Sequence, residues 1–85
     1  MFVKLDGWTK VGDTVSPTGK WTVYRFRGGE FDDVTVVDSF PPEDPEKAAK
    51  LYGKTVKDVK HGAVWLIAPD GRVDAMLFIR PGEAR

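Results

Sequence analysis

Turn-forming residues recur at short intervals along this chain and divide it into runs too short for most helical folds. Four signals stand out: Asp6-Gly7, Ser16-Pro17-Thr18-Gly19, Gly28-Gly29 and Ala68-Pro69-Asp70-Gly71. Asp-Gly and Gly-Gly supply the positive φ that two-residue hairpin turns require. The last signal predicts a type I turn followed by a glycine in the left-handed conformation. Tight turns between short runs favour antiparallel strands.

Four runs between these turns have the β-branched and aromatic composition of strands. They cover residues 21–27, 34–40, 62–68 and 72–80. In the second run, period-two alternation places Val34, Val36 and Phe40 on one face. The third run is apolar almost throughout, which suits a central strand.

The fourth run alternates cleanly, and its apolar face is Val73, Ala75, Leu77 and Ile79. We expect this face to be buried with residues of the helix and the third run, namely Leu51, Tyr52, Val64 and Leu66. Met76 and Phe78 then fall on the polar face of an edge strand, where exposed apolar side chains invite strand pairing. The sequence therefore also predicts either a weak homodimer or an edge strand that docks to another protein.

One stretch, residues 44–52, has helical spacing. Asp44 is the expected N-cap and Pro45 the first helical residue. The apolar stripe consists of Ala48, Ala49, Leu51 and Tyr52. Gly53 is predicted to end the helix, and residues 55–58 to form a second short turn.

Strands, one helix and more strands along the chain predict an α+β fold. We expect an antiparallel sheet of four or five strands with the main helix packed on one face. Partial curling of this sheet into a barrel is the alternative. Residues 1–85 are expected to form a single small domain in which residues 81–85 are a flexible tail.

Composition excludes several kinds of chemistry. The chain has no cysteine and one histidine, which removes disulfides, thiolate chemistry and zinc sites rich in these residues. It has no apolar run long enough to span a membrane, and its first residues lack the apolar core of a signal peptide. We therefore expect a cytoplasmic protein with no membrane association, no cofactor and no metal.

No motif for catalysis is complete. Gly53-Lys54-Thr55 resembles the end of a phosphate-binding loop, but Ala48 stands where that loop needs its first glycine. Nucleophilic catalysis needs a nucleophile, a base and an orienting group, and the only serines and histidine fall in turns or at strand ends. Asp32 and Asp33 would point to opposite faces of a strand, so they cannot act as a carboxylate pair. The sequence therefore predicts a protein that is not an enzyme.

The order of the charges is uneven although the net charge is zero. Residues 28–46 carry seven acidic and no basic side chains, whereas residues 47–60 carry five lysines and one aspartate. These charges either pair with each other inside the protein or serve a partner. An acidic patch of this size steers a basic partner and fixes its register.

Our first hypothesis is a protein-binding module whose acidic surface meets a basic protein. The expected partner-binding residues are Glu30, Asp32, Asp33, Asp38 and Glu43. Asp44 is left out because helix capping accounts for it.

The alternative is a nucleic-acid-binding domain that uses a lysine row, with Gly53 as an argument against its continuity. This row consists of Lys47, Lys50, Lys54 and Lys57. A third hypothesis is a small enzyme whose site forms only in an oligomer.

A small, cysteine-free domain with an acidic strip and no catalytic set is similar in type to small inhibitors of larger machines. Phage-encoded inhibitors of host defence, including anti-CRISPR proteins, share this profile. The similarity concerns composition and size, and it assigns no role to any residue.

Overall fold

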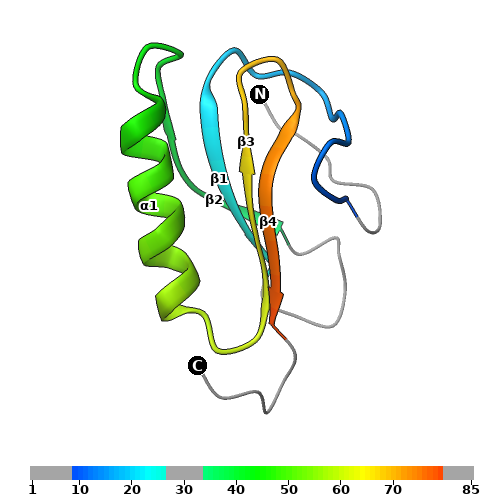
Figure 1. Ribbon diagram of the computed structural model, residues 1–85, viewed down its shortest axis with the longest axis vertical. Helices are drawn as coiled ribbons and strands as arrows, with labels where there is room; N and C mark the ends of the chain where they lie inside the picture. Colours follow the sequence, from blue (N-terminus) through cyan, green and yellow to red (C-terminus); the bar gives the residue numbers. More distant parts are fainter. Residues whose placement is uncertain (1–8, 27–33, 80–85) are drawn as a thin grey trace.

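A four-stranded antiparallel sheet with one helix packed against it forms the frame of the protein (Figure 1). The computed structural model describes residues 9–26 and 34–79. The elements are β1 (Trp21–Phe26), β2 (Val34–Phe40), α1 (Pro45–Asp58), β3 (Gly62–Ile67) and β4 (Val73–Ile79), and the strand order is β2-β1-β3-β4. The predicted α+β fold is confirmed, and the sheet is open rather than curled into a closed barrel. The predicted turns at Asp6-Gly7 and Gly28-Gly29 and the predicted tail lie outside the described residues.

The turn between β3 and β4 has the predicted form. The Gly71 N–H donates to the Ala68 carbonyl at 2.9 Å, and Gly71 has a φ of 92°. Asp70 Oδ1 accepts from the Arg72 N–H at 3.1 Å, which fixes the tip of the turn. A side chain at Gly71 would also clash with the Val15 carbonyl oxygen. Glycine is therefore required here twice, for its φ and for the close approach of another segment.

α1 does not end at Gly53, so that prediction is wrong. The helix continues to Asp58, and the predicted second turn at residues 55–58 is part of it. Thr55, Val56 and Val59 lie beyond the glycine and pack toward the sheet, and Val59 is 1% exposed. Glycine in a helix costs only about 1 kcal/mol relative to alanine, which this burial outweighs.

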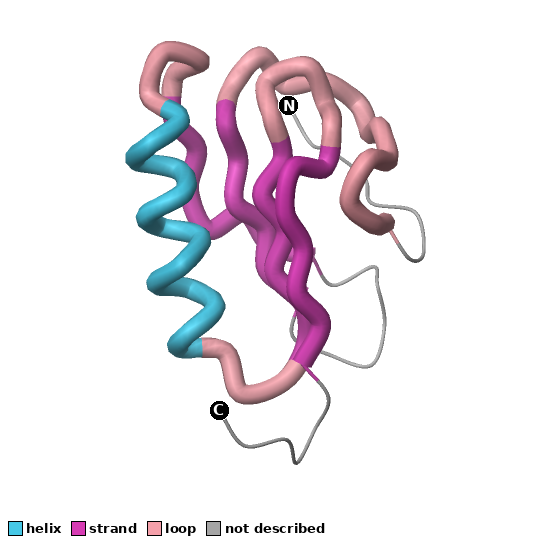
Figure 2. Tube along the Cα trace, viewed as in Figure 1, coloured by secondary structure: helices cyan, strands magenta, loops and turns pink. Residues whose placement is uncertain are grey.

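The face of the sheet that α1 covers forms the first core cluster. Its buried members are Val23, Ala48, Val59, Val64 and Leu66. Leu51, Tyr52, Ala75 and Leu77 are partly buried against them, as the alternation in β4 predicted. In Figure 2 the helix stands along this one face of the sheet.

The opposite face of the sheet is also apolar and forms a second core cluster. Its buried members are Tyr24, Phe26, Ala63, Trp65, Ile67 and Val73. Met76 and Phe78 are partly buried against this second cluster, so they do not lie on a polar face. Trp65 and Tyr24 are its largest fully buried side chains.

Two bulges explain the wrong face assignments. In β4 the register moves from Leu66↔Ala75 to Ile67↔Val73, so that Asp74 is an extra residue and Val73 joins the second cluster. One extra residue reverses every later side chain along a strand. The side chain of Ile79 is outside the described part.

In β2 the register moves from Tyr24↔Val36 to Val23↔Asp38, with Val37 as the extra residue. Phe40 therefore packs on the α1 side and not with Val34, contrary to the predicted alternation.

Residues 9–20 run beside the β3–β4 turn and are held there by backbone hydrogen bonds (Figure 1, blue). Val15 N–H donates to the Gly71 carbonyl at 2.8 Å, and Val73 N–H donates to the Asp13 carbonyl at 2.8 Å. Gly19 N–H donates to the Pro69 carbonyl at 3.0 Å and not to Ser16, where the predicted turn would place it. These bonds attach the N-terminal segment to the start of β4.

Two glycine substitutions should act in opposite directions. Gly53→Ala should stabilise the protein by about 1 kcal/mol, because the backbone is helical and an added Cβ meets nothing within 4 Å. Gly71→Ala should destabilise it by at least about 2 kcal/mol, because alanine is strained at this φ and clashes with Val15. Urea unfolding of both variants measures the two effects. A destabilising Gly53→Ala would mean that the helix does end at residue 53.

Candidate binding surfaces

Two of the five predicted acidic residues, Asp38 and Glu43, lie in the described part of the chain, and both are exposed. Asp38 is opposite Val23 in the register, and its Oδ1 accepts from the Ser39 N–H at 2.8 Å. Glu43 lies in the short loop between β2 and α1. Neither carboxylate forms an ion pair with any described residue. The other three, Glu30, Asp32 and Asp33, are outside the described residues.

Asp44 occupies the predicted N-cap position, but its side chain makes no capping hydrogen bond. Its carboxylate instead lies 3.7 Å from Lys47 Nζ, in an ion pair that is largely exposed. Capping therefore does not account for Asp44, and the reason for leaving it out of the acidic surface is wrong. With Glu43 and Glu46 it lines a surface hollow of about 270 Å³ at the start of α1.

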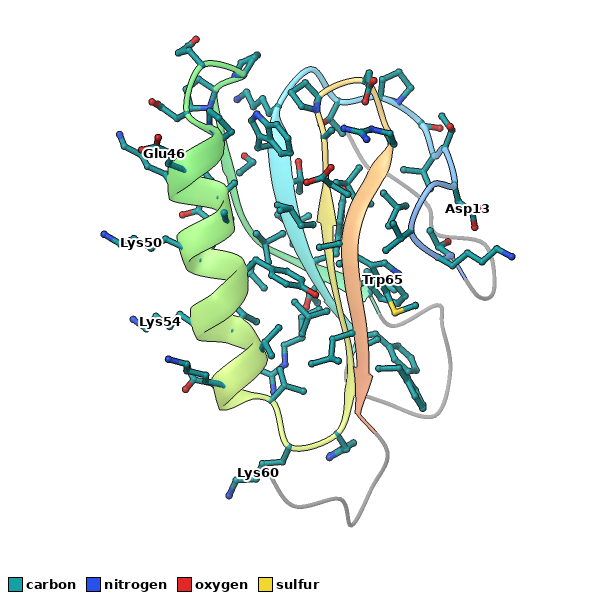
Figure 3. All side chains as sticks on the ribbon, viewed as in Figure 1. Asp13, Glu46, Lys50, Lys54, Lys60 and Trp65 are labelled. Atoms are coloured by element: carbon teal, nitrogen blue, oxygen red, sulfur yellow. The ribbon has the colours of Figure 1, made fainter. Side chains whose placement is uncertain are left out.

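The lysine row lies on one continuous helix. Because α1 passes through Gly53, spacings of three and four place Lys47, Lys50, Lys54 and Lys57 on one side of it. All four side chains are exposed. In Figure 3, Lys50 and Lys54 point away from the sheet, and Lys60 lies beyond the end of the helix. The argument that Gly53 interrupts this row is therefore wrong.

The acidic and basic stretches hardly neutralise each other in the described residues. Asp44–Lys47 is the ion pair that joins them there, and Arg72–Asp74, at 3.1 Å, lies elsewhere, at the start of β4. Lys50, Lys54 and Lys57 have no carboxylate within 4.0 Å among those residues. An exposed pair such as Asp44–Lys47 contributes little to stability. Both charged surfaces therefore remain available to solvent or to a partner.

The two serines and the histidine come from three different segments of the fold. His61 is exposed in the loop after α1, Ser16 is exposed in the N-terminal segment, and Ser39 is exposed on β2. Within residues 9–26 and 34–79, no three histidine or carboxylate side chains gather as a metal site. In that same part, no helix is long and apolar enough to cross a membrane.

A pocket that the sequence analysis missed lies on the sheet face opposite α1. It has a volume of about 180 Å³ and is lined by Thr18, Lys20, Thr22, Tyr24, Val36 and Ser39. Thr22 pairs with Ser39 and Tyr24 with Val36 across β1 and β2, and the loop before β1 supplies the other two residues. The alternation of Thr22 and Tyr24 in β1 was the only signal in the sequence. Their β2 partners depend on the bulge at Val37, which alternation does not predict.

No protein-family model, curated protein or solved structure matches this chain. The candidate surfaces of the protein are therefore assigned from their geometry and charge alone.

Proposed function

We propose that the protein is a non-enzymatic binding module that uses its acidic surface to engage a basic protein. The described members of this surface are Asp38 on β2 and Glu43 before α1, and Asp44 and Glu46 lie next to Glu43. From the sequence we also assign Glu30, Asp32 and Asp33 to it, and these lie outside the described residues. The observation that carries the proposal is that Asp38 and Glu43 are exposed and unpaired among the described residues. Unpaired like charges repel each other in the folded protein, so a basic partner would relieve a cost that solubility alone does not explain.

An inhibitory role is the specific form of this proposal. A small domain with an acidic face competes for a basic groove by presenting carboxylates where that groove expects phosphates. Inhibition of this kind needs no catalytic group and no cofactor. It requires a rigid frame, which the two core clusters supply.

Reversing the charge of Asp38 and Glu43 should abolish partner binding without changing the melting temperature. Neither carboxylate contacts a lysine or arginine in the described structure, so their loss removes no internal ion pair. The hydrogen bond that Asp38 accepts from the Ser39 N–H is exposed and joins adjacent residues, so water replaces it at little cost. The measurement is quantitative capture of proteins from a nuclease-treated native lysate by the wild type and by Asp38→Lys/Glu43→Lys. Thermal denaturation of both proteins accompanies it. A second variant adds Asp32→Lys and Asp33→Lys.

The matched control is Asp58→Lys, which reverses an exposed aspartate at the far end of α1 that forms no ion pair with any described residue. It should capture the same proteins as the wild type. If both charge-reversal variants also capture them unchanged, the acidic surface is not the binding site. If binding falls only together with the melting temperature, the acids serve the fold and the proposal is wrong.

Nucleic-acid binding through the lysine row is the second candidate, and the continuity of α1 favours it. Four exposed lysines on one side of a helix form a positively charged row that can neutralise phosphates. Two observations rank it second. Glu46 and Asp58 lie on the same helix, and the row contains no arginine for bidentate phosphate contacts.

Under this second function, Lys50→Glu/Lys54→Glu should weaken binding to a short DNA or RNA duplex at least tenfold. Fluorescence anisotropy at several salt concentrations measures it, and the salt dependence should become shallower by about one unit for each phosphate that the variant no longer neutralises. Lys10→Glu, in the N-terminal segment, is the control. Duplex binding that is absent in the wild type, or equal in all three proteins, excludes this function.

A further inference from the structure

The pocket on the sheet face opposite α1 combines a rigid floor with polar groups that have no partner among the described residues. Tyr24 is 1% exposed and belongs to the second core cluster, so its ring cannot move without disturbing that core. Thr22 and Val36 lie on β1 and β2, beside and across from it. The pocket is thus built mainly on strands, which hold side chains more firmly than loops do.

Two threonines fix the rim of the pocket. Thr18 Oγ1 donates to the Lys20 carbonyl at 3.1 Å and accepts from the Lys20 N–H at 3.3 Å. Thr22 Oγ1 donates to the same carbonyl at 3.2 Å. These bonds hold the backbone of Lys20 in place before β1 begins. They also use the threonine hydroxyl protons, so the threonines shape the site and are not its main donors.

Three donors remain without a protein partner in the described structure: the Tyr24 hydroxyl, the Ser39 hydroxyl and the Lys20 ammonium group. Of these three donors, the Tyr24 hydroxyl is the strongest indication of a binding site. A phenylalanine would fill the same core position without bringing in a hydroxyl that has to be satisfied. Burial raises the pKa of the Tyr24 hydroxyl above its ordinary value, so this hydroxyl keeps its proton at neutral pH and is available as a donor.

The charge of the pocket is positive. Among the described residues that line it, Lys20 is the one that carries a charge. Asp38 is adjacent to Ser39 in sequence, but it lies opposite Val23 in the register, on the side of the sheet that α1 covers. Its carboxylate is therefore directed away from this site.

We propose that this pocket binds a small oxyanion group, with the Lys20 ammonium supplying the charge and the Tyr24 and Ser39 hydroxyls supplying hydrogen bonds. At about 180 Å³ it is smaller than the pockets that hold drug-sized ligands, so it fits a carboxylate or phosphate group with a short attachment. Exposed Val36, at the edge of the site, offers an apolar contact to that attachment. The described residues that line the site include none of the acidic residues and none of the lysines of the row.

The test is a titration of isotopically labelled protein with inorganic phosphate and, separately, with acetate, followed by backbone amide NMR. The expected result is a saturable shift of the amides of Thr22, Tyr24 and Ser39 with at least one of the two probes. Which probe binds more tightly distinguishes a phosphate ligand from a carboxylate ligand. Glycerol, which has hydroxyls but no charge, should shift none of these amides in a saturable way.

Tyr24→Phe is the decisive variant because it keeps the ring in the core and removes only the hydroxyl. It should raise the dissociation constant about tenfold, in line with the loss of one hydrogen bond to a charged group, without lowering the melting temperature. Lys20→Ala should weaken binding at least as much. The matched controls, Tyr52→Phe on the α1 side and Lys60→Ala after the helix, should bind as the wild type does.

Three results would overturn the proposal. One is the absence of a saturable shift with either probe. Another is equal binding by Tyr24→Phe and the wild type, which would place the anion elsewhere. The third is saturable binding of glycerol as tight as that of phosphate or acetate, which would make the pocket a site for neutral hydroxyl groups.

Discussion

The structure depends on β3, whose six residues are all buried. A strand that is apolar on both faces must be covered on both. α1 covers one face through Val64 and Leu66, while Trp65 and Ile67 enter the second cluster on the other. Trp65 also donates its Nε1–H to the Thr9 carbonyl at 2.9 Å, which ties the N-terminal segment to the centre of the sheet. The protein therefore has two thin cores that share one strand, an economical arrangement for a chain of 85 residues without disulfides.

Local signals in the sequence predicted the elements well because each depends on near neighbours. β2 begins and ends where its composition indicated, and the Ala68–Gly71 turn needed only its proline and glycine positions. Predictions that depended on distant contacts were less successful. The helix passes through Gly53 because Val59 packs on the sheet, and no local rule includes that contact. Met76 and Phe78 looked exposed because nothing in their own strand reveals a second core.

The candidate surfaces show the same difference between features that follow from the local sequence and features that depend on distant contacts. The uneven distribution of charge can be read from the sequence. The lysine row forms because α1 is continuous through Gly53. Whether the acids pair with those lysines depends on distances, and among the described residues Asp44–Lys47 is the pair that joins the two stretches. The hydroxyl-lined pocket depends on how β1 and β2 are aligned, so residues as far apart as Thr18 and Ser39 meet there.

The bulge at Val37 places Asp38, a member of the acidic surface, and Ser39, which lines the pocket, on opposite faces of the sheet. Without that extra residue, continued pairing would place Asp38 opposite Thr22 and Ser39 opposite Trp21. A carboxylate would then enter the pocket beside Lys20, and Phe40 would leave the core under α1. With the bulge, Ser39 faces the pocket, Asp38 stays on the side of the sheet that α1 covers, and Phe40 remains packed on that side. One additional residue in an exposed edge strand thus serves the core and both candidate sites, which is a physical reason for β2 to keep an irregularity that weakens its pairing.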